Sequence, residues 1–206
     1  MAHRICRIAG DGVGHDVMEA ASLVVEALGL DLEWVDAEAG WCCWEKFKTT
    51  VPDGTWEALE SSECCLFGAI TSRPGIPGFR SAILQIRQRF DLYANVRPVK
   101  AYAGVPLNYR DDIDLVIFRE NTEGLYSGVE WRPLPEEIIG QHPLLERFRG
   151  EEIAGSLRVF TRRGCRRIAE QAFEFAHRHG RKSVAAVHKA NVIRETCGMF
   201  LEEVRA

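Results

Sequence analysis

A chain of 206 residues with 46% hydrophobic content is long enough to bury the core of one large domain or two small ones. Its formal net charge is −4, with Lys and Arg mixed among Asp and Glu, which excludes the basic footprint of a protein that binds nucleic acid or anionic membranes. No run approaches the ~20 apolar residues of a membrane span, and the start MAHRICRIAG lacks the apolar core of a signal peptide, so we expect a cytoplasmic protein.

The first half of the chain alternates strand and helix patterns, as a parallel α/β sheet requires. In chain order we predict a strand at 4–9, a tight loop at 10–14, a helix at 16–28, a strand at 32–35, a short helix at 55–59, a strand at 64–70, a loop at 71–78 and a helix at 81–89. The helix at 16–28 is predicted to be amphipathic because its apolar residues recur at helical spacing: Val17, Ala20, Ala21, Val24 and Leu28.

The second half begins near residues 98–104, where we place a domain boundary. The later elements are predicted as a strand at 115–118, a Pro-rich irregular excursion at 131–150, a strand at 156–160, a helix at 163–178, a strand at 184–187 and a helix at 195–204. The excursion is too long and too apolar to be an ordinary connection, which favours a role in an interface.

A dense set of polar side chains follows the predicted strand at 115–118, in the segment RENTEGLY. The carboxyl ends of strands in open α/β sheets are where ligands bind. Arg119 offers a planar fork to a carboxylate, and Tyr126 offers a phenolic proton donor. An acidic surface loop after a core strand would give the same pattern, so this segment alone leaves both interpretations open.

Two further segments favour the binding site. DLYANVRP is flanked by Arg87 and contains Arg97, and HKANV places Lys189 and Asn191 just after another apolar run. Together with the loop GDGVG at 10–14, these segments resemble the β-decarboxylating dehydrogenases of malate-type acids, a family that includes isocitrate, homoisocitrate, 3-isopropylmalate and tartrate dehydrogenases. The resemblance runs from about residue 5 to the last residue, and the combination of motifs is highly specific.

The resemblance implies an α/β, isopropylmalate-dehydrogenase-like two-domain fold that is not a Rossmann fold, truncated after its first half. Its first domain would span residues 1–98, and its second would span residues 99–206, incomplete at the C-terminus. An arm at about 124–160 would clasp a second subunit, so the expected partner is a second copy of the chain or a complementing C-terminal chain. The spacing of Gly10, Gly12 and Gly14 does not fit the Rossmann pattern G-x-G-x-x-G.

The resemblance also implies the chemistry, which is the NAD-dependent oxidative decarboxylation of a malate-type 2-hydroxy acid. Tyr126 would be the catalytic proton donor, and Lys189, expected to be buried beside arginines with a depressed proton affinity, would assist proton transfer at the hydroxyl. The implied substrate-binding residues are Ser81, Arg87, Arg97, Arg119 and Asn191, and the implied cofactor-binding residues are Ile70, Thr71 and Asn191. The ligands of a Mg²⁺ or Mn²⁺ ion are expected in the absent C-terminal part, with no metal ligand in this chain.

The substrate stays open between isocitrate, homoisocitrate and 3-isopropylmalate, and the cofactor between NAD and NADP. Phe79, Ile83 and Leu84 would form an apolar pocket, as in isopropylmalate and tartrate dehydrogenases, although Ser81 matches the isocitrate enzymes and Arg80 could meet an acidic substituent. We expect the chain to be inactive alone. The alternative function is that of a non-catalytic regulatory or partner subunit, against which the presence of Tyr126 and Lys189 argues.

Overall fold

The computed structural model describes residues 2–73 and 75–206 and divides the chain into two compact units, Met1–Ile86 and Arg87–Ala206. The sequence suggested a boundary between residues 98 and 99, and that domain assignment stays a prediction. The predicted loop at 71–78 includes Pro74, which lies outside the described residues. Within the described residues, no helix is long and apolar enough to span a bilayer.

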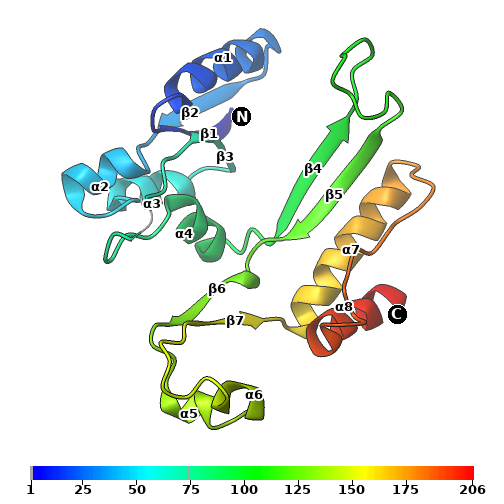
Figure 1. The fold of residues 1–206 in the computed structure, drawn as a ribbon. Helices are drawn as coiled ribbons and strands as arrows, with labels where there is room; N and C mark the ends of the chain where they lie inside the picture. Colours follow the sequence, from blue (N-terminus) through cyan, green and yellow to red (C-terminus); the bar gives the residue numbers. More distant parts are fainter. Residues whose placement is uncertain (1, 74) are drawn as a thin grey trace. The chain divides into compact units, whose positions relative to one another are not determined.

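The first unit is built on a parallel sheet with the strand order β2-β1-β3, shown in Figure 1. Its strands are β1 (His3–Gly10), β2 (Leu32–Asp36) and β3 (Cys64–Ala69). Because β1 is the central strand, its alternate side chains Cys6 and Ile8 are fully buried. The sequence therefore predicted both the strands and the parallel arrangement of this unit.

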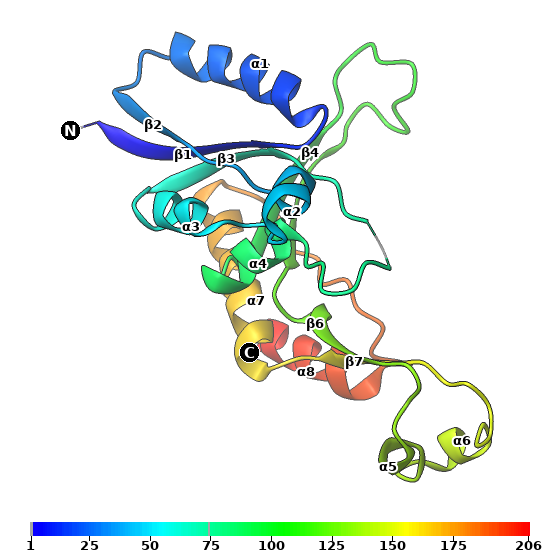
Figure 2. The same cartoon turned by 90° about the vertical axis from the view of Figure 1, so that its left-hand side faces the viewer.

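Helices cover both faces of this sheet. As Figure 2 shows, α1 (Gly14–Ala27) lies on one side, and α2 (Trp41–Phe47) and α3 (Asp53–Glu60) lie on the other. The buried side of α1 consists of Gly14, Met18 and Ser22. Four of the five apolar residues expected on the inner side of this helix are exposed instead, namely Val17, Ala20, Val24 and Leu28. A sheet of three strands is too narrow to cover the whole apolar surface of α1.

The second unit contains an antiparallel pair of strands with a helix on one face. Helix α4 (Ala82–Arg89) crosses from the first unit into β4 (Ala94–Lys100), which pairs with β5 (Asp114–Glu120). Helix α7 (Arg162–Arg178) packs on this pair, with the rings of Phe118 and Phe175 5.2 Å apart, and α8 (Arg194–Arg205) packs on α7. Helices α4, α7 and α8 and strand β5 were predicted, with their ends displaced by at most two residues, whereas no strand was predicted at the position of β4.

The excursion between β5 and α7 is more ordered than its sequence suggested. It consists of β6 (Gly124–Trp131), α5 (Glu136–Ile139), α6 (Pro143–Glu146) and β7 (Gly155–Val159), and β6 pairs with β7 in the antiparallel sense. Its apolar residues divide into two sets: Leu134 and Ile139 are buried, whereas Leu144 and Phe148 are exposed. We call residues 124–160 the arm.

The strand predicted at 184–187 is absent. Residues 183–189 form no helix, turn or strand in the structure, although Val184 to Val187 is a continuous apolar run. A strand needs a neighbour with which to exchange backbone hydrogen bonds, and none of the described strands pairs with this segment. The prediction of a strand at 184–187 is therefore wrong for the described residues, although the run is apolar.

Candidate functional site

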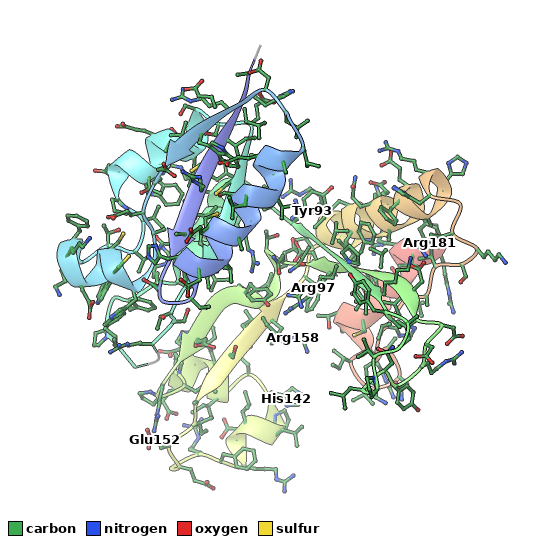
Figure 3. All side chains as sticks on the ribbon, turned by 90° about the horizontal axis from the view of Figure 1, so that it is seen from above. Tyr93, Arg97, His142, Glu152, Arg158 and Arg181 are labelled. Atoms are coloured by element: carbon green, nitrogen blue, oxygen red, sulfur yellow. The ribbon has the colours of Figure 1, made fainter. Side chains whose placement is uncertain are left out.

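The pairing of β4 with β5 places two of the predicted arginines on one face. Asn95 lies opposite Arg119, and Arg97 lies opposite Ile117, so the side chains of Arg97 and Arg119 project to the same side. Phe118 projects to the other side, where α7 covers it. Arg97, labelled in Figure 3, is exposed and donates from Nε to Asn95 Oδ1 at 3.1 Å. This face of the strand pair therefore carries at least two fixed positive charges.

Tyr126 on β6 joins these arginines. Arg119 Nη2 donates a hydrogen bond to the Tyr126 hydroxyl, and the Arg119 guanidinium carbon lies 5.1 Å from the centroid of the Tyr126 ring. The backbone oxygen of Tyr126 also accepts from Gln88 Nε2 at 3.4 Å, which links β6 to the end of α4. The phenol and the guanidinium that the resemblance assigned to one site thus lie in direct contact.

Arg87, in the last turn of α4, completes the cluster. Burial lowers the pKa of its guanidinium, the Tyr126 side chain opposes that shift, and the positive charges of Arg97 and Arg119 lower the pKa further. Within residues 2–73 and 75–206, no carboxylate forms an ion pair with any of these three arginines. Like charges held together without a counter-ion repel one another. An anion with two carboxylates would relieve this repulsion, and we call Arg87, Arg97, Arg119 and Tyr126 the arginine–tyrosine cluster.

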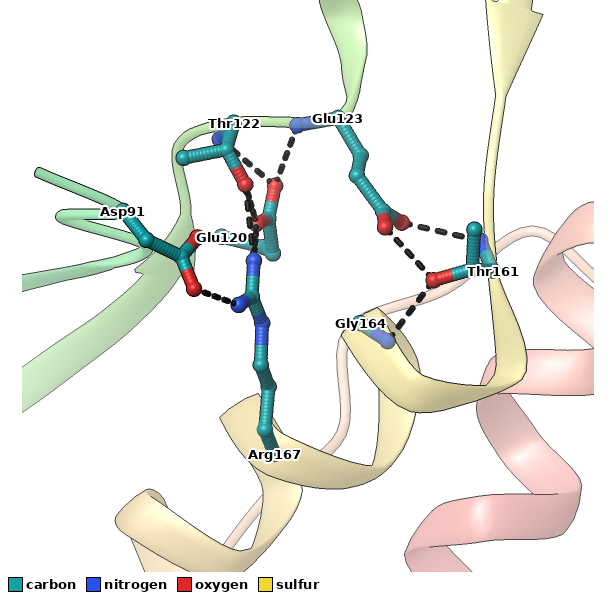
Figure 4. A network of polar contacts seen from close by, with 7 residues as sticks. All are labelled: Asp91, Glu120, Thr122, Glu123, Thr161, Gly164 and Arg167. Atoms are coloured by element: carbon teal, nitrogen blue, oxygen red, sulfur yellow. Dashed lines mark hydrogen bonds and ion pairs between the residues drawn. The ribbon is translucent and has the colours of Figure 1, made fainter. Parts of the chain in front are cut away.

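The turn that connects Arg119 to Tyr126 is held by hydrogen bonds to Glu120, shown in Figure 4. The Glu120 carboxylate accepts from the backbone N–H groups of Thr122 and Glu123, at 2.9 and 2.8 Å. Arg167 on α7 donates to Thr122 Oγ1 at 2.8 Å and to Glu120 at 3.2 Å, and its other terminal nitrogen pairs with Asp91 at 2.6 Å. The turn after β5 is therefore fixed to α7 and to the chain before β4.

The same turn is fixed a second time at the start of α7. Glu123 accepts from the backbone N–H and the hydroxyl of Thr161, at 2.8 and 2.5 Å, and the Thr161 hydroxyl accepts in turn from Gly164 N–H at 2.9 Å. A Cβ at Gly164 would lie 2.3 Å from the Glu123 carboxylate, so a larger residue there would displace this carboxylate. The buried Asn121 contributes a side-chain oxygen without a hydrogen-bond partner among the described residues.

Sequence reasoning missed the part that Arg167 plays. The local pattern, in which the basic residues at 158–167 are followed by Glu170 and Glu174, favours an exposed helix face. The side chain of Arg167 is only 13% exposed, and its partners are Asp91 and Glu120, which are distant in sequence. The available signal was helical spacing, because Arg167 lies next to the buried residues Ile168 and Ala169 on the inner side of α7.

The other predicted site residues are not joined to the cluster. Lys189 and Asn191 are exposed, and in the described part of the chain no hydrogen bond or ion pair links their side chains to the arginines. The expectation that Lys189 is buried is wrong for this chain, because none of the described strands pairs with the segment before it. Ser81, Ile70 and Thr71 belong to the first unit, and their roles stay predictions.

The predicted cofactor residues Ile70 and Thr71 adjoin a well-ordered carboxylate. Asp11, in the loop after β1, accepts from the backbone N–H groups of Trp41, Cys42 and Thr71, each at 2.8 Å. Burial alone would raise the pKa of Asp11, but these hydrogen bonds outweigh it and lower the pKa. The amide of Thr71 is therefore occupied, and its exposed side chain is the part that a ligand could contact.

No group of three or more His, Cys, Asp or Glu side chains among residues 2–73 and 75–206 is arranged to hold a metal ion. A hard cation such as Mg²⁺ needs several oxygen ligands. The described residues by themselves therefore do not fit the metal that the resemblance implies.

Comparisons with known proteins give the family of this chain. The family model for isocitrate/isopropylmalate dehydrogenase matches residues 4–206. The chain belongs to the isocitrate/isopropylmalate dehydrogenase family. Among solved structures, that of isocitrate dehydrogenase from Methylococcus capsulatus covers 98% of the chain with a TM-score of 0.85 and 40% identity. The α/β fold expected for this family is thereby confirmed.

Curated relatives carry several names within the family. The chain is 45% identical over 206 residues to "Isocitrate/homoisocitrate dehydrogenase" of Thermus thermophilus and 40% identical over 200 residues to "3-isopropylmalate dehydrogenase" of Methanothermobacter thermautotrophicus. These two alignments include 100% and 97% of this chain, but only 56% and 54% of the respective relatives. The chain thus spans about half the length of the curated relatives that it matches.

Proposed function

We propose that this chain carries the substrate-reacting residues of an NAD-dependent, metal-dependent dehydrogenase that oxidises and decarboxylates a malate-type 2-hydroxy acid. The observation that supports the proposal best is the arginine–tyrosine cluster. Three guanidinium groups that have no carboxylate partner among the described residues lie near one another, and one of them contacts a phenol. This arrangement suits a substrate with several carboxylates and a proton-accepting carbon.

In the proposed reaction, Arg87, Arg97 and Arg119 bind and orient the substrate carboxylates. The hydrogen bond from Arg119 fixes the Tyr126 hydroxyl, so that the phenol can deliver its proton to the enol carbon formed when carbon dioxide leaves. Lys189 accepts the proton of the substrate hydroxyl, and Asn191 orients the substrate. For Lys189 to act in this way, its segment must become buried, as a second polypeptide covering it would allow.

NAD, when bound, would accept the hydride from the substrate's hydroxyl-bearing carbon. Ile70 and Thr71 are proposed to contact it through the loop that Asp11 holds. NAD is proposed rather than NADP, although relatives named for each cofactor are similar to the chain. The metal ligands are proposed to lie in a part of the complete enzyme that has no counterpart here, so the isolated chain should not reduce NAD with any of the candidate acids.

The substrate's third-carbon group is proposed to contact the start of α4. Ile83 and Leu84 are half-buried there, whereas the ring of Phe79 packs against Trp41 and Trp44, with centroids 5.7 and 5.5 Å away. If this apolar surface reads the substrate, a complete enzyme should prefer 3-isopropylmalate to isocitrate by about 1–3 kcal/mol in kcat/KM. Competing kinetics of the two acids would measure this, and a preference for isocitrate would exclude an apolar pocket.

Binding of malate, the common core of these substrates, tests the cluster without turnover. Isothermal titration of the chain with malate should detect binding, and Arg119→Gln should weaken it at least about tenfold, because a charge-assisted hydrogen bond is lost. Arg163→Gln is the matched control, since Arg163 is exposed and lies on α7. Equal affinity in both variants would show that malate does not bind at the cluster.

We propose further that the arm pairs with a second copy of the chain. A two-stranded sheet is marginal alone, and Leu125, Leu157 and Val159 expose apolar side chains on β6 and β7. Lys189 of one subunit would then act beside Tyr126 of the other. In a complete enzyme, mixing Tyr126→Phe with Lys189→Met subunits should restore activity through hybrid dimers, and hybrids that regain none would contradict shared sites.

A further inference from the structure

The first turn of α2 carries two adjacent thiols that the proposed dehydrogenase reaction does not use. Cys42 Sγ and Cys43 Sγ lie 3.9 Å apart. The Cys43 side chain is fully buried, whereas Cys42 is half-buried and keeps access to solvent. We call these two side chains the α2 dithiol, which a ligand can reach from the side of Cys42.

The other adjacent pair of cysteines, Cys64 and Cys65, is arranged differently. It lies in β3, where successive side chains project to opposite faces of the sheet, and Cys65 lies opposite Cys6 of β1 instead. Successive side chains of a helix are only about 100° apart around its axis, which lets the two sulfurs of α2 meet. Local structure, and not adjacency in sequence, thus distinguishes the two pairs.

Hydrogen bonds fix the backbone of the α2 dithiol. Asp11 accepts from the backbone N–H groups of Trp41 and Cys42, each at 2.8 Å. The Cys42 thiol donates to the carbonyl oxygen of Ala39, which lies 3.9 Å from its sulfur. A site that is ordered before a ligand arrives loses little conformational entropy on binding, which favours affinity.

Both thiols of the pair are held in the protonated form. Burial raises the pKa of the Cys42 thiol, and the Asp11 carboxylate beside it raises that pKa further. Burial also raises the pKa of the Cys43 thiol, to about 12. The thiolate is the form that binds metal cations and attacks disulfides. A neutral dithiol is therefore suited to an uncharged ligand that reacts with both sulfurs.

Neither a zinc ion nor a disulfide suits the α2 dithiol. Among residues 2–73 and 75–206, no group of three or more His, Cys, Asp or Glu side chains is arranged to hold a metal ion, so tetrahedral zinc would lack ligands. A disulfide usually joins Cα atoms at least about 4.4 Å apart, whereas the Cα atoms of adjacent residues are only about 3.8 Å apart. A disulfide between Cys42 and Cys43 would therefore require α2 to unwind.

We propose that Cys42 and Cys43 chelate a trivalent arsenical of the form R–As(OH)2. Such a compound is uncharged at neutral pH, and its arsenic exchanges hydroxyl groups for thiol sulfur. In this reaction two As–O bonds and two S–H bonds break, two As–S bonds form, and two molecules of water leave. Arsenic stays in the +3 state throughout. Because the product is neutral, no charge is desolvated in the half-buried site.

Phenylarsine oxide, which is C6H5As(OH)2 when hydrated, is the probe that tests this proposal without any dependence on catalysis. Excess 2-mercaptoethanol is added to displace arsenic from single thiols. Native mass spectrometry of the whole chain should then show one phenylarsenic group in place of two hydrogens. Fluorescence of Trp41 and Trp44, which border the dithiol in sequence, should change on binding and give the Kd. We expect Cys42→Ser to weaken binding at least about 100-fold, because two linked thiols act at a high effective concentration.

Variants of the other thiols locate the site. Cys43→Ser should weaken binding as Cys42→Ser does. Cys65→Ser is the matched control, because it changes the adjacent pair of β3 and removes the thiol opposite Cys6, and it should keep the parental affinity. Cys42→Ala takes the place of Cys42→Ser if circular dichroism shows that the serine variant is not folded.

Several outcomes would overturn the proposal. They are a chain that binds no phenylarsenic group, and affinity that is unchanged when the Cys42 thiol is removed. Loss of binding in Cys65→Ser would assign the arsenic to the thiols of β1 and β3 instead. A loss of two hydrogens without a gain of arsenic would mean that a disulfide forms in place of the chelate.

Discussion

Arg167 links three separate parts of the second unit: helix α7, the turn after β5 and the chain before β4. Its side chain is 13% exposed and its partner Glu120 18%, so both charges are largely removed from water. Removing one partner of such a pair leaves an uncompensated charge. We predict that Arg167→Met lowers the free energy of unfolding by about 2–4 kcal/mol, after allowance for the exposed Asp91.

Urea denaturation of the 206-residue chain measures this effect. Arg163→Met is the matched control, because Arg163 is exposed on the same helix, and its replacement should change the free energy by less than about 0.5 kcal/mol. Equal effects of the two substitutions would contradict the assignment of Arg167 as the fixed point of the turn after β5.

Asp11 makes the first unit sensitive to acid. Its folded pKa is lowered, so its contribution to stability is fully present above the unfolded value near 4 and is lost as the pH falls through the lower folded pKa. We predict that Asp11→Ala costs about 2–4 kcal/mol at pH 7, since three backbone N–H groups lose their acceptor.

The pH dependence of stability distinguishes the contribution of Asp11 from that of the other carboxylates. Urea midpoints measured between pH 7 and pH 3 should fall less steeply for Asp11→Ala than for the parent chain. The reason is that the variant lacks the Asp11 carboxylate, which takes up a proton when the parent chain unfolds in acid. Asp31→Ala, at an exposed position, is the control and should keep the parental slope. Parallel curves for Asp11→Ala and the parent would contradict the lowered pKa.

At the scale of elements, α7 is the helix on which the site depends. Thr161 is its N-cap, and the same hydroxyl donates to Glu123 while accepting from Gly164. We predict that Thr161→Ala destabilises the chain by about 1–2 kcal/mol, the scale of a lost N-cap. Thr161→Ser keeps the hydroxyl and should stay within about 0.5 kcal/mol of the parent in thermal or urea unfolding. Similar losses in both variants would mean that the methyl group matters, and not the cap.

The elements also show what a local pattern can and cannot predict. Strand β5 and helix α7 follow from apolar periodicity, and the adjacency of Arg119 and Tyr126 follows from the polar run after β5. The register that puts Arg97 beside Arg119 required the structure, because antiparallel pairing is not encoded within either strand. Residues 184–187 have a strand pattern and no strand, because a strand also depends on a neighbour elsewhere in the molecule.

At the scale of the whole molecule, many large apolar side chains are exposed to solvent. Examples in separate places are Val24 on α1, Leu125 on β6 and Ile117 on β5. Exposed apolar surface on this scale is typical of contacts with further polypeptide. The length of the relatives is consistent with that interpretation, since they are nearly twice as long as the chain.

The central claim is that this chain carries the reacting side chains of a decarboxylating dehydrogenase. A hybrid in which residues 1–206 replace the matched part of the Thermus enzyme tests it most directly, by formation of NADH from isocitrate, homoisocitrate or 3-isopropylmalate with Mg²⁺. We predict turnover with at least one of these acids and a loss of at least about 100-fold in kcat for Tyr126→Phe. A folded hybrid without turnover, or a Tyr126→Phe hybrid as active as its parent, would contradict the claim.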